Sequence, residues 1–137
     1  MLNRRLLLGA SAALAGTLAL PAAAAPAAFV RRQGTGFTLG GKPYRFAGAN
    51  LWYGAYLAAD APFGDRLRLT RELDRLQAIG ATNLRILASA ELSPLKNSLR
   101  PTFRNEGSAY DDALLGGLDW LLAEMAKRDM RAVLYLT

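Results

Sequence analysis

The sequence predicts an α/β fold in which parallel strands alternate with helices, and three observations lead to this prediction. First, after a short β-ribbon, segments with strand and helix patterns follow in the order β, α, β, α, β. Such alternation is typical of a parallel sheet with right-handed crossovers. Second, apolar residues repeat at helical spacing in two segments. Third, the apolar run at residues 132–137 is typical of a buried parallel strand.

A parallel sheet of this kind is either an open, doubly wound sheet or a (β/α)8 TIM barrel. The open dinucleotide-binding version carries G-x-G-x-x-G directly after its first strand. Here residues 48–53 read Gly-Ala-Asn-Leu-Trp-Tyr, which is bulky where a pyrophosphate needs close backbone approach. The sequence therefore favours the barrel. A complete barrel takes ~250 residues, so we expect an incomplete one: about the first three strands and two helices, preceded by an N-terminal β-hairpin.

Residues 1–24 have the pattern of an export signal peptide. Arg4 and Arg5 form a basic start, residues 6–20 an apolar stretch, and residues 21–25 a small-residue cleavage region. The paired arginines resemble the twin-arginine variant, although Asn3 stands where such signals often have Ser or Thr. An uncleaved membrane anchor is the alternative, but the apolar stretch is shorter than the ~20 residues of a spanning helix. We therefore expect a secreted or periplasmic protein with no membrane contact after cleavage.

The composition restricts the chemistry. The chain has no cysteine and no histidine, which excludes disulfides, thiol chemistry and the commonest general base and metal ligand. Any catalysis must use carboxylates, Tyr, Ser or Lys. Without Arg4 and Arg5 the formal net charge falls from +6 to +4. The basic residues at 66–75 alternate with acidic ones, which indicates a solvated helix face, so we expect no nucleic-acid partner.

The ribbon is predicted from two short strands and a glycine turn. Residues 29–32 and 37–39 have strand composition. Gly40 and Gly41 can supply the positive φ angles of a tight hairpin turn. That turn leads into a predicted strand at residues 44–49.

The first predicted helix is followed by the second strand of the alternating region. Its apolar stripe recurs at spacings of four, three and three residues: Leu69, Leu73, Leu76 and Ile79. Asp65 is the expected N-cap and Gly80 the expected C-terminal stop. Residues 82–87 then have the composition and length of a strand.

A polar connection at residues 89–108 leads to the second predicted helix. It is long for a plain βα loop, and such loops are usually functional or disordered. The helix has a stripe at i, i+4, i+7, i+8 and i+11: Leu114, Leu118, Leu121, Leu122 and Met125. Asp111 or Asp112 near its start and Lys127 and Arg128 near its end suit the helix dipole.

Three segments carry a family resemblance. Residues 29–54, 82–87 and 121–136 resemble the N-terminal part of glycoside hydrolase family 5, and within it most of all the secreted endo-β-1,4-mannanases. The resemblance implies that residues 25–137 are the N-terminal portion of a (β/α)8 catalytic domain whose bottom the hairpin covers. It implies a retaining hydrolase of β-1,4-mannosidic bonds in mannan-type polysaccharides. Such an enzyme uses no metal or cofactor, and we expect a monomer when complete.

The resemblance places the catalytic glutamates outside this chain. The family uses an acid/base at the end of strand four and a nucleophile at the end of strand seven. Retaining chemistry needs these carboxyl groups ~5–5.5 Å apart. Neither strand is present here, so no carboxylate of this chain takes either role, and we expect the chain alone to be inactive.

What carries over is the sugar-facing periphery. Arg85 matches the strand-two arginine that would hydrogen-bond the missing nucleophile and lower its pKa. The alternative is a surface ion pair, but burying an unpaired arginine within an apolar strand would be expensive. Asn50, Trp52 and Tyr53 match the substrate-binding loop after strand one, where aromatic faces stack on pyranose rings. For Trp52 a place in the hydrophobic core is an equally good interpretation. Glu91 lies beyond strand two, where it either contacts the substrate or is an ordinary solvated glutamate.

Three other interpretations stay open. One is a non-catalytic carbohydrate-binding remnant, and another is a cellulase-type family 5 enzyme. The third is an exported α/β interaction or nucleotide-binding module unrelated to sugars. The sequence does not distinguish mannan, glucomannan and cellulose as the substrate.

Overall fold

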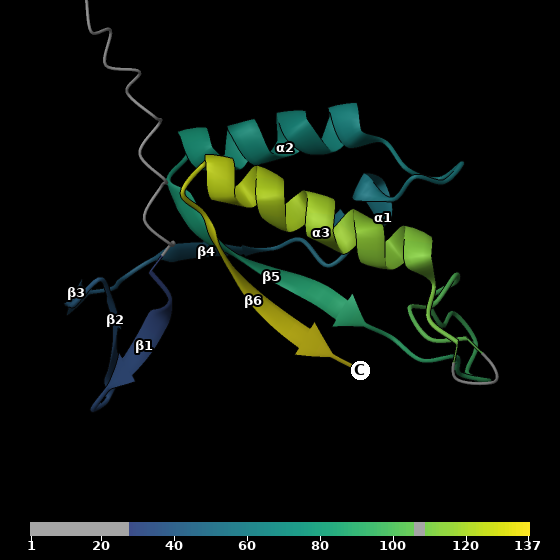
Figure 1. Cartoon of the computed structure of the whole chain (residues 1–137), viewed down its shortest axis with the longest axis horizontal. Coiled ribbons are helices and arrows are strands. Elements are labelled where there is room, and N and C mark those ends of the chain that lie inside the picture. Colours follow the sequence, from purple (N-terminus) through teal and green to yellow (C-terminus); the bar gives the residue numbers. More distant parts are fainter. Residues whose placement is uncertain (1–27, 106–108) are drawn as a thin grey trace, which may run out of the picture.

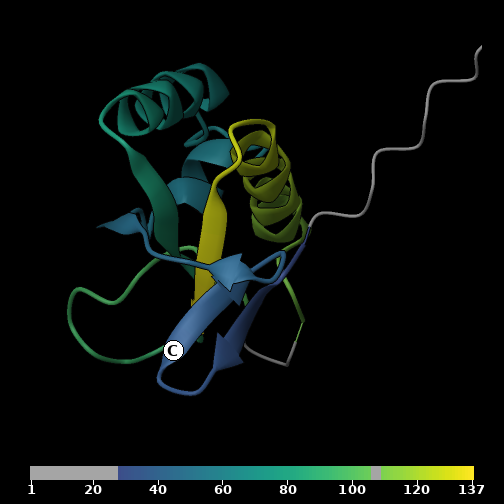
Figure 2. The same cartoon turned by 90° about the vertical axis from the view of Figure 1, so that its left-hand side faces the viewer.

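The computed structural model describes residues 28–105 and 109–137, so the predicted export signal at residues 1–24 lies outside the described residues. The chain forms an antiparallel ribbon and, separately, a parallel sheet with helices on one face (Figures 1 and 2). The ribbon has the order β1 (Val30–Gln33), β2 (Gly36–Leu39) and β3 (Lys42–Pro43). Across the described residues, no helix is long and apolar enough to cross a membrane.

The turns of the ribbon occur at glycines, but the strand expected at residues 44–49 is divided. Gly40 and Gly41 connect β2 to β3 with φ angles of 56° and 78°. After β3, Tyr44 still donates its backbone N–H to the Phe37 carbonyl at 2.8 Å. The next strand, β4 (Ala47–Asn50), belongs to the other sheet. The prediction of one strand was wrong because this run pairs first with an antiparallel and then with a parallel partner, so the chain changes direction.

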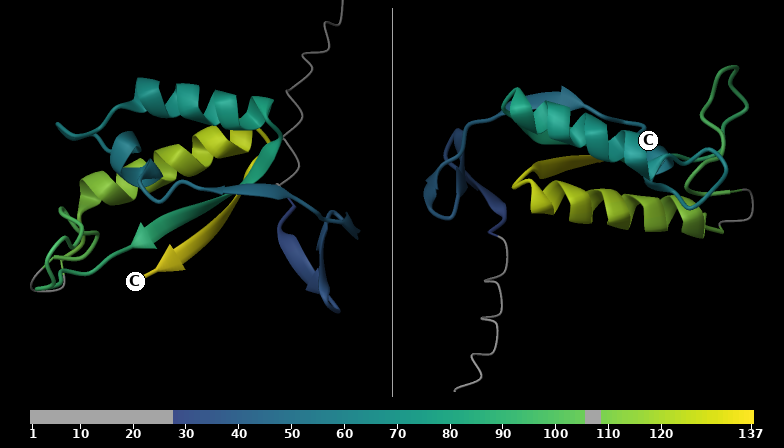
Figure 3. Two further views of the ribbon diagram at one scale, coloured as in Figure 1. Left: turned by 180° about the vertical axis from the view of Figure 1, so that it is seen from behind. Right: turned by 90° about the horizontal axis from the view of Figure 1, so that it is seen from above.

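The parallel sheet has the order β4-β5-β6, with β5 (Ala81–Ser89) in the centre and β6 (Arg131–Leu136) at one edge. Both pairings are parallel, as the alternating pattern predicted. The ribbon lies near the N-terminal ends of these strands, while the connection from β5 to α3 extends beyond their C-terminal ends (Figure 3). The sheet is not closed into a barrel in the part of the chain that is described.

Three helices cover the sheet: α1 (Gly54–Ala58), α2 (Arg66–Ala78) and α3 (Asp112–Lys127). The predicted N-cap of α2 is confirmed, because the Asp65 carboxylate accepts the backbone N–H of Arg68 at 2.8 Å. Asp111 caps α3 in the same way and Asp112 lies in its first turn, so the helix begins with acidic residues as expected. Helix α1 was not predicted, since five residues are too few to show a helical period.

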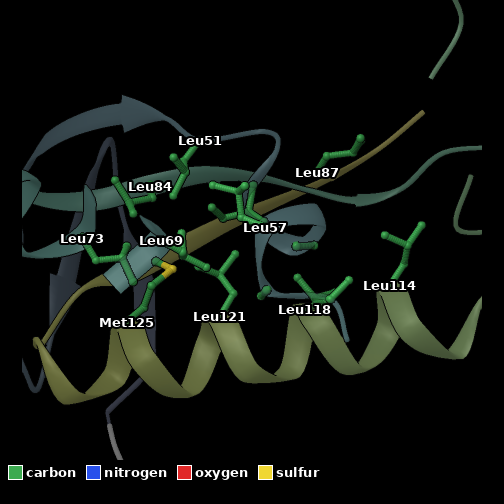
Figure 4. Close-up of a cluster of buried hydrophobic side chains, with 14 of the residues drawn as sticks. Leu51, Leu57, Leu69, Leu73, Leu84, Leu87, Leu114, Leu118, Leu121 and Met125 are labelled. Carbon is green, nitrogen blue, oxygen red and sulfur yellow. The ribbon is translucent and has the colours of Figure 1, made fainter. Parts of the chain in front are cut away.

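The apolar stripes of α2 and α3 form most of the core, together with side chains of β4, β5 and α1 (Figure 4). The labelled side chains all belong to this buried cluster: Leu51, Leu57, Leu69, Leu73, Leu84, Leu87, Leu114, Leu118, Leu121 and Met125. Ile79 is an exception to the predicted stripe, because it is 78% exposed as the C-cap residue of α2. At Ile79 the helix ends and the chain turns away from the core, so this side chain is not buried.

A partly buried ion-pair network joins the C-terminal ends of α2 and α3. Arg128 donates to Glu124 Oε2 at 2.8 Å and forms an ion pair with Asp74 of α2 at 2.7 Å. Lys127 adds a further ion pair to Glu124. The hydrogen bond from Lys127, followed by that from Arg128, holds the pKa of the Glu124 carboxyl below its ordinary value.

This network predicts an acid-sensitive fold. A carboxyl group whose pKa is lowered in the folded state stabilises the fold above its ordinary pKa and loses that contribution as pH falls through the folded pKa. Glu124→Gln is expected to lower the free energy of unfolding at pH 7 by about 2 kcal/mol, because it replaces charged hydrogen bonds by neutral ones. Below pH ~4 the difference from the parent should shrink.

Urea unfolding of both proteins between pH 7 and pH 3 measures this effect. Asp119→Asn, on an exposed position of the same helix, is the matched control. If the difference in the free energy of unfolding between the parent and Glu124→Gln is the same at every pH, the prediction is contradicted.

Candidate functional site

The candidate site lies on the sheet face opposite the helices, towards the C-terminal ends of the strands. Asn50 ends β4 and is paired in register with Arg85 of β5. The Arg85 Nη1 donates to Asn50 Oδ1 at 3.5 Å, and its Cζ lies 3.4 Å from the centre of the Tyr135 ring in β6. Three adjacent strands therefore each contribute one side chain to this cluster, which we call the Arg85 cluster.

The burial argument for Arg85 was wrong. Its neighbours Leu84 and Ile86 are fully buried under the helices, but Arg85 itself is exposed, because alternate residues of a strand face opposite sides. Because the Arg85 guanidinium is exposed to water, folding does not remove its hydration, and it needs no charged partner. Within the described residues no ion pair involves Arg85. Asn50 and the Tyr135 ring contact its guanidinium and orient it.

Tyr135 was not singled out in the sequence, although a signal for it was present. In the parallel register Arg85 is opposite Val133, so Tyr135, two residues further along β6, shares the same face. A cation above a tyrosine ring is attracted by about 0.5–2 kcal/mol, depending on how far the pair is removed from water. This contact orients Arg85 without neutralising its charge.

Tyr53 points away from Arg85. Its hydroxyl donates to Glu72 Oε2 of α2 at 2.9 Å, and the guanidinium of Arg68 lies 6.0 Å from its ring centre. Burial, followed by the hydrogen bond to Glu72, raises the pKa of the Tyr53 hydroxyl above its ordinary value. Tyr53 and Asn50 do meet in another way, because both line a pocket of about 250 Å³ beside β4 that also includes Glu72.

Trp52 is neither a core residue nor fully solvated, since 38% of it is exposed. Its ring lies edge-on to Tyr53, with centres 5.5 Å apart, and 6.2 Å from Tyr56. Trp52 lines a second pocket, of about 220 Å³, between the start of α1 and the β5–α3 connection. That pocket contains Tyr56, Phe63 and Arg100, none of which was selected from the sequence.

Glu91 lies two residues beyond β5 and is exposed. Its carboxylate pairs with Arg104 Nη1 at 2.9 Å. An exposed pair of this kind contributes little to stability. Glu91 also lines an open pocket of about 520 Å³ with Ser93, Asn97 and Thr137, at the C-terminal ends of β5 and β6. Glu91 therefore lies at the expected end of the sheet, but its carboxylate pairs with Arg104 and not with Arg85.

The acidic residues of the described part act mainly in the fold. Asp65 and Asp111 cap helices, and the others with ion pairs or hydrogen bonds bind neighbouring side chains: Glu72, Asp74, Glu91, Glu124 and Asp129. Among the described residues no group of three or more acidic, His or Cys side chains could hold a metal ion. The cluster of Asn50, Arg85 and Tyr135 can bind and orient an anion or a polar ligand, but it contains no carboxylate that could act as a nucleophile or as a general acid or base.

Comparison with known proteins gives a consistent result. The family model described as "GH family 5 beta-mannosidase-like" matches residues 27–137. A putative mannan endo-1,4-beta-mannosidase 9 of Oryza sativa subsp. japonica is 32% identical over 108 residues, which are 79% of this chain and 25% of that protein. A putative mannan endo-1,4-beta-mannosidase 4 of Arabidopsis thaliana is 27% identical over the same length, again 79% of this chain and 25% of the relative.

Solved structures agree with these relatives. The crystal structure of a glycoside hydrolase family 5 mannosidase from Rhizomucor miehei matches with a TM-score of 0.71 and 38% identity, covering 78% of this chain and 27% of that one. An endo-1,4-beta-mannanase from the same organism matches with a TM-score of 0.59 and 23% identity, covering 77% and 29%, and supports the fold alone. The chain thus spans about a quarter of the length of the proteins it matches.

Proposed function

Because the chain belongs to glycoside hydrolase family 5, we propose that residues 25–137 are the N-terminal portion of a retaining hydrolase that cleaves β-1,4-mannosidic bonds in mannan-type polysaccharides. The observation that carries this proposal is the Arg85 cluster, at the C-terminal side of three adjacent parallel strands. In (β/α)8 barrels the active site is built at that side. The curated relatives are described as mannan endo-1,4-beta-mannosidases, which supports mannan as the substrate.

In this proposal Arg85 supports catalysis without reacting. Its guanidinium donates to a nucleophilic carboxylate and keeps that carboxylate ionised, because a nearby positive charge lowers its pKa. Asn50 and Tyr135 hold the guanidinium in place. The nucleophile and the acid/base are glutamates of later strands, ~5–5.5 Å apart, which form and then hydrolyse a glycosyl-enzyme intermediate. No metal or cofactor takes part.

Residues 25–137 alone are expected to release no sugar from galactomannan. The described acidic side chains are largely committed to caps and ion pairs, and the catalytic pair belongs to strands four and seven of the barrel. The test compares them with the encoded protein, by which we mean the protein read from residue 25 to the end of its open reading frame. Reducing-end release by residues 25–137 that scales with their concentration would overturn this prediction. Absence of hydrolysis by the encoded protein would overturn the proposed function.

The mode of attack on mannan is part of the same test. We propose endo cleavage, as in the names of the curated relatives. The alternative is a mannosidase acting on shorter substrates. One observation speaks for this alternative: the chain is 38% identical to the Rhizomucor miehei mannosidase and only 23% identical to the endo-mannanase of the same organism. Endo cleavage lowers the viscosity of galactomannan before much reducing sugar appears, whereas the alternative releases small products with little change in viscosity. Equal activity on cellulose would favour the cellulase-type interpretation, and binding without cleavage would favour the carbohydrate-binding remnant.

We also propose export through the predicted signal at residues 1–24 and a monomeric mature protein. Arg4→Lys together with Arg5→Lys should block export of a tagged protein by the twin-arginine route, which depends on the arginine pair. Cell fractionation measures this. Unchanged appearance of the double variant outside the cytoplasm would exclude that route, and retention of the parent protein in the cytoplasm would contradict export itself.

A further inference from the structure

The guanidinium of Arg85 has two neighbours in its cluster, and the two contacts differ in strength. The distance from Nη1 to the Asn50 Oδ1 is 3.5 Å, at the outer limit of a hydrogen bond. The Cζ atom, in contrast, lies 3.4 Å from the centre of the Tyr135 ring, which is close van der Waals contact. Two other arginine–aromatic contacts in the described part of the chain are longer, at 5.2 and 6.0 Å. Tyr135 is therefore the neighbour that holds the guanidinium most firmly.

The Tyr135 ring is itself held in place by the sheet and the core. In the parallel register of β5 and β6, Tyr135 is opposite Leu87 and Val133 is opposite Arg85. Residues two apart in a strand share a face, so Tyr135 lies diagonally across from Arg85 on the same face of the sheet. Its ring is half-buried and packs against the hydrophobic core, whereas Asn50 is exposed. An anchored ring can position a long, exposed side chain that a solvated amide cannot hold alone.

The ring contacts the face of the guanidinium and leaves its edge free. With Cζ 3.4 Å from the ring centre, the guanidinium plane lies roughly parallel to the ring, because a strong tilt would push nitrogen atoms into it. The five N–H donors of an arginine lie in the guanidinium plane and point outward from its edge. The contact with Tyr135 therefore orients the group, fixes the direction of its donors and uses none of them.

We propose that Tyr135 is a positioning residue of the mannan-cleaving site, and that its ring, not its hydroxyl group, directs the Arg85 donors towards the nucleophilic carboxylate. This role rests on the proposed function, which supplies the nucleophile, while the contact between guanidinium and ring rests on the geometry. Without the ring, Arg85 exchanges among rotamers. Its charge then spends less time beside the carboxylate and keeps it ionised less effectively.

Steady-state kinetics of the encoded protein on galactomannan test this role. Tyr135→Leu removes the ring and is expected to lower kcat about tenfold, because the guanidinium is kept but misdirected. The acidic limb of its kcat/KM profile should move to higher pH. Tyr135→Phe keeps the ring and should restore the parent's pH profile, with kcat within about threefold of the parent. Tyr44→Leu, which removes a half-buried ring near the N-terminal end of β5, is the matched control and should leave both unchanged.

A double-mutant cycle shows whether Tyr135 acts through Arg85. In an Arg85→Ala background, Tyr135→Leu should lower kcat no further, because no guanidinium remains to be directed. A further loss of the same size as in the parent would make Tyr135 an independent substrate contact and overturn the proposal. Equal losses in Tyr135→Phe and Tyr135→Leu would assign the effect to the hydroxyl group and overturn it as well.

A measurement without turnover separates this role from the proposed function. The ring current of a tyrosine shifts protons above its face upfield, so the Arg85 Nε–H signal should lie upfield in nuclear magnetic resonance spectra of the parent and of Tyr135→Phe, but not of Tyr135→Leu. Arg85→Lys identifies the signal by its loss. Absence of the shift in the parent overturns positioning by Tyr135 and leaves the proposed function standing. The shift in a protein that hydrolyses no mannan supports positioning of Arg85 by Tyr135 and overturns the proposed function.

Discussion

Gly117→Ala is expected to lower the free energy of unfolding by about 3 kcal/mol, towards the upper end for overpacking a core. A Cβ atom at Gly117 would lie 2.3 Å from the Ala55 carbonyl oxygen and 2.8 Å from the Ala59 nitrogen. Both are backbone atoms of α1 or its C-cap, so no flexible side chain can yield. Because α1 begins two residues after Trp52, its displacement should also disturb the pocket that Trp52 and Tyr56 line.

Gly116→Ala is the matched control. It is the neighbouring residue in α3 and is exposed, and a Cβ atom there would meet nothing within 4 Å. Alanine in a helix interior is about 0.5–1 kcal/mol more favourable than glycine, so Gly116→Ala should be slightly stabilising. Urea unfolding of the two variants measures the difference. A midpoint for Gly117→Ala equal to or above that of Gly116→Ala would show that α1 and α3 are not packed as described.

Arg85→Ala is expected to lower kcat of the encoded protein on mannan by on the order of 10²- to 10³-fold, the effect of removing one oriented donor at a reacting group. Without the guanidinium the pKa of the nucleophile rises. The acidic limb of the kcat/KM profile should therefore move to higher pH. Because Arg85 is exposed and forms no ion pair within the described residues, the free energy of unfolding should change little.

Thr82→Ala is the control for Arg85→Ala, because Thr82 is exposed at the start of the same strand, away from its C-terminal end. Steady-state kinetics between pH 4 and pH 8 on both variants separate the two effects. A loss confined to KM, with kcat and the pH profile unchanged, would make Arg85 a substrate contact and not a support of the nucleophile.

Much of the fold followed from the sequence because the helices and strands carry strong, long-range patterns. The parallel alternation, the cap at Asp65, the acidic start of α3 and its apolar stripe are confirmed. The family resemblance is confirmed by the match over residues 27–137. Short-range features failed for physical reasons. Helix α1 is shorter than two helical turns, and the strand expected at residues 44–49 divides because its two halves pair with different sheets.

The candidate site was only partly predictable. Asn50 and Arg85 are in contact because the parallel register places them opposite each other. The family resemblance predicted both residues as parts of one site. The directions of the side chains could not be predicted in this way. The Tyr53 hydroxyl donates to Glu72 of α2, and Trp52 lines a pocket with Tyr56 and Phe63. These contacts depend on how α1 and α2 pack, which no local pattern encodes. The roles of Asn50, Trp52, Tyr53, Arg85 and Glu91 in catalysis or substrate binding stay predictions.

A crystal structure of the encoded protein with mannobiose bound tests the central claim most directly. We expect the Arg85 guanidinium within hydrogen-bond distance of a carboxylate, and a second carboxylate ~5–5.5 Å from the first, on the other side of the glycosidic bond. A pair of carboxylates ~6.5–9.5 Å apart would indicate an inverting enzyme. An Arg85 side chain far from any carboxylate would contradict the role given to it here.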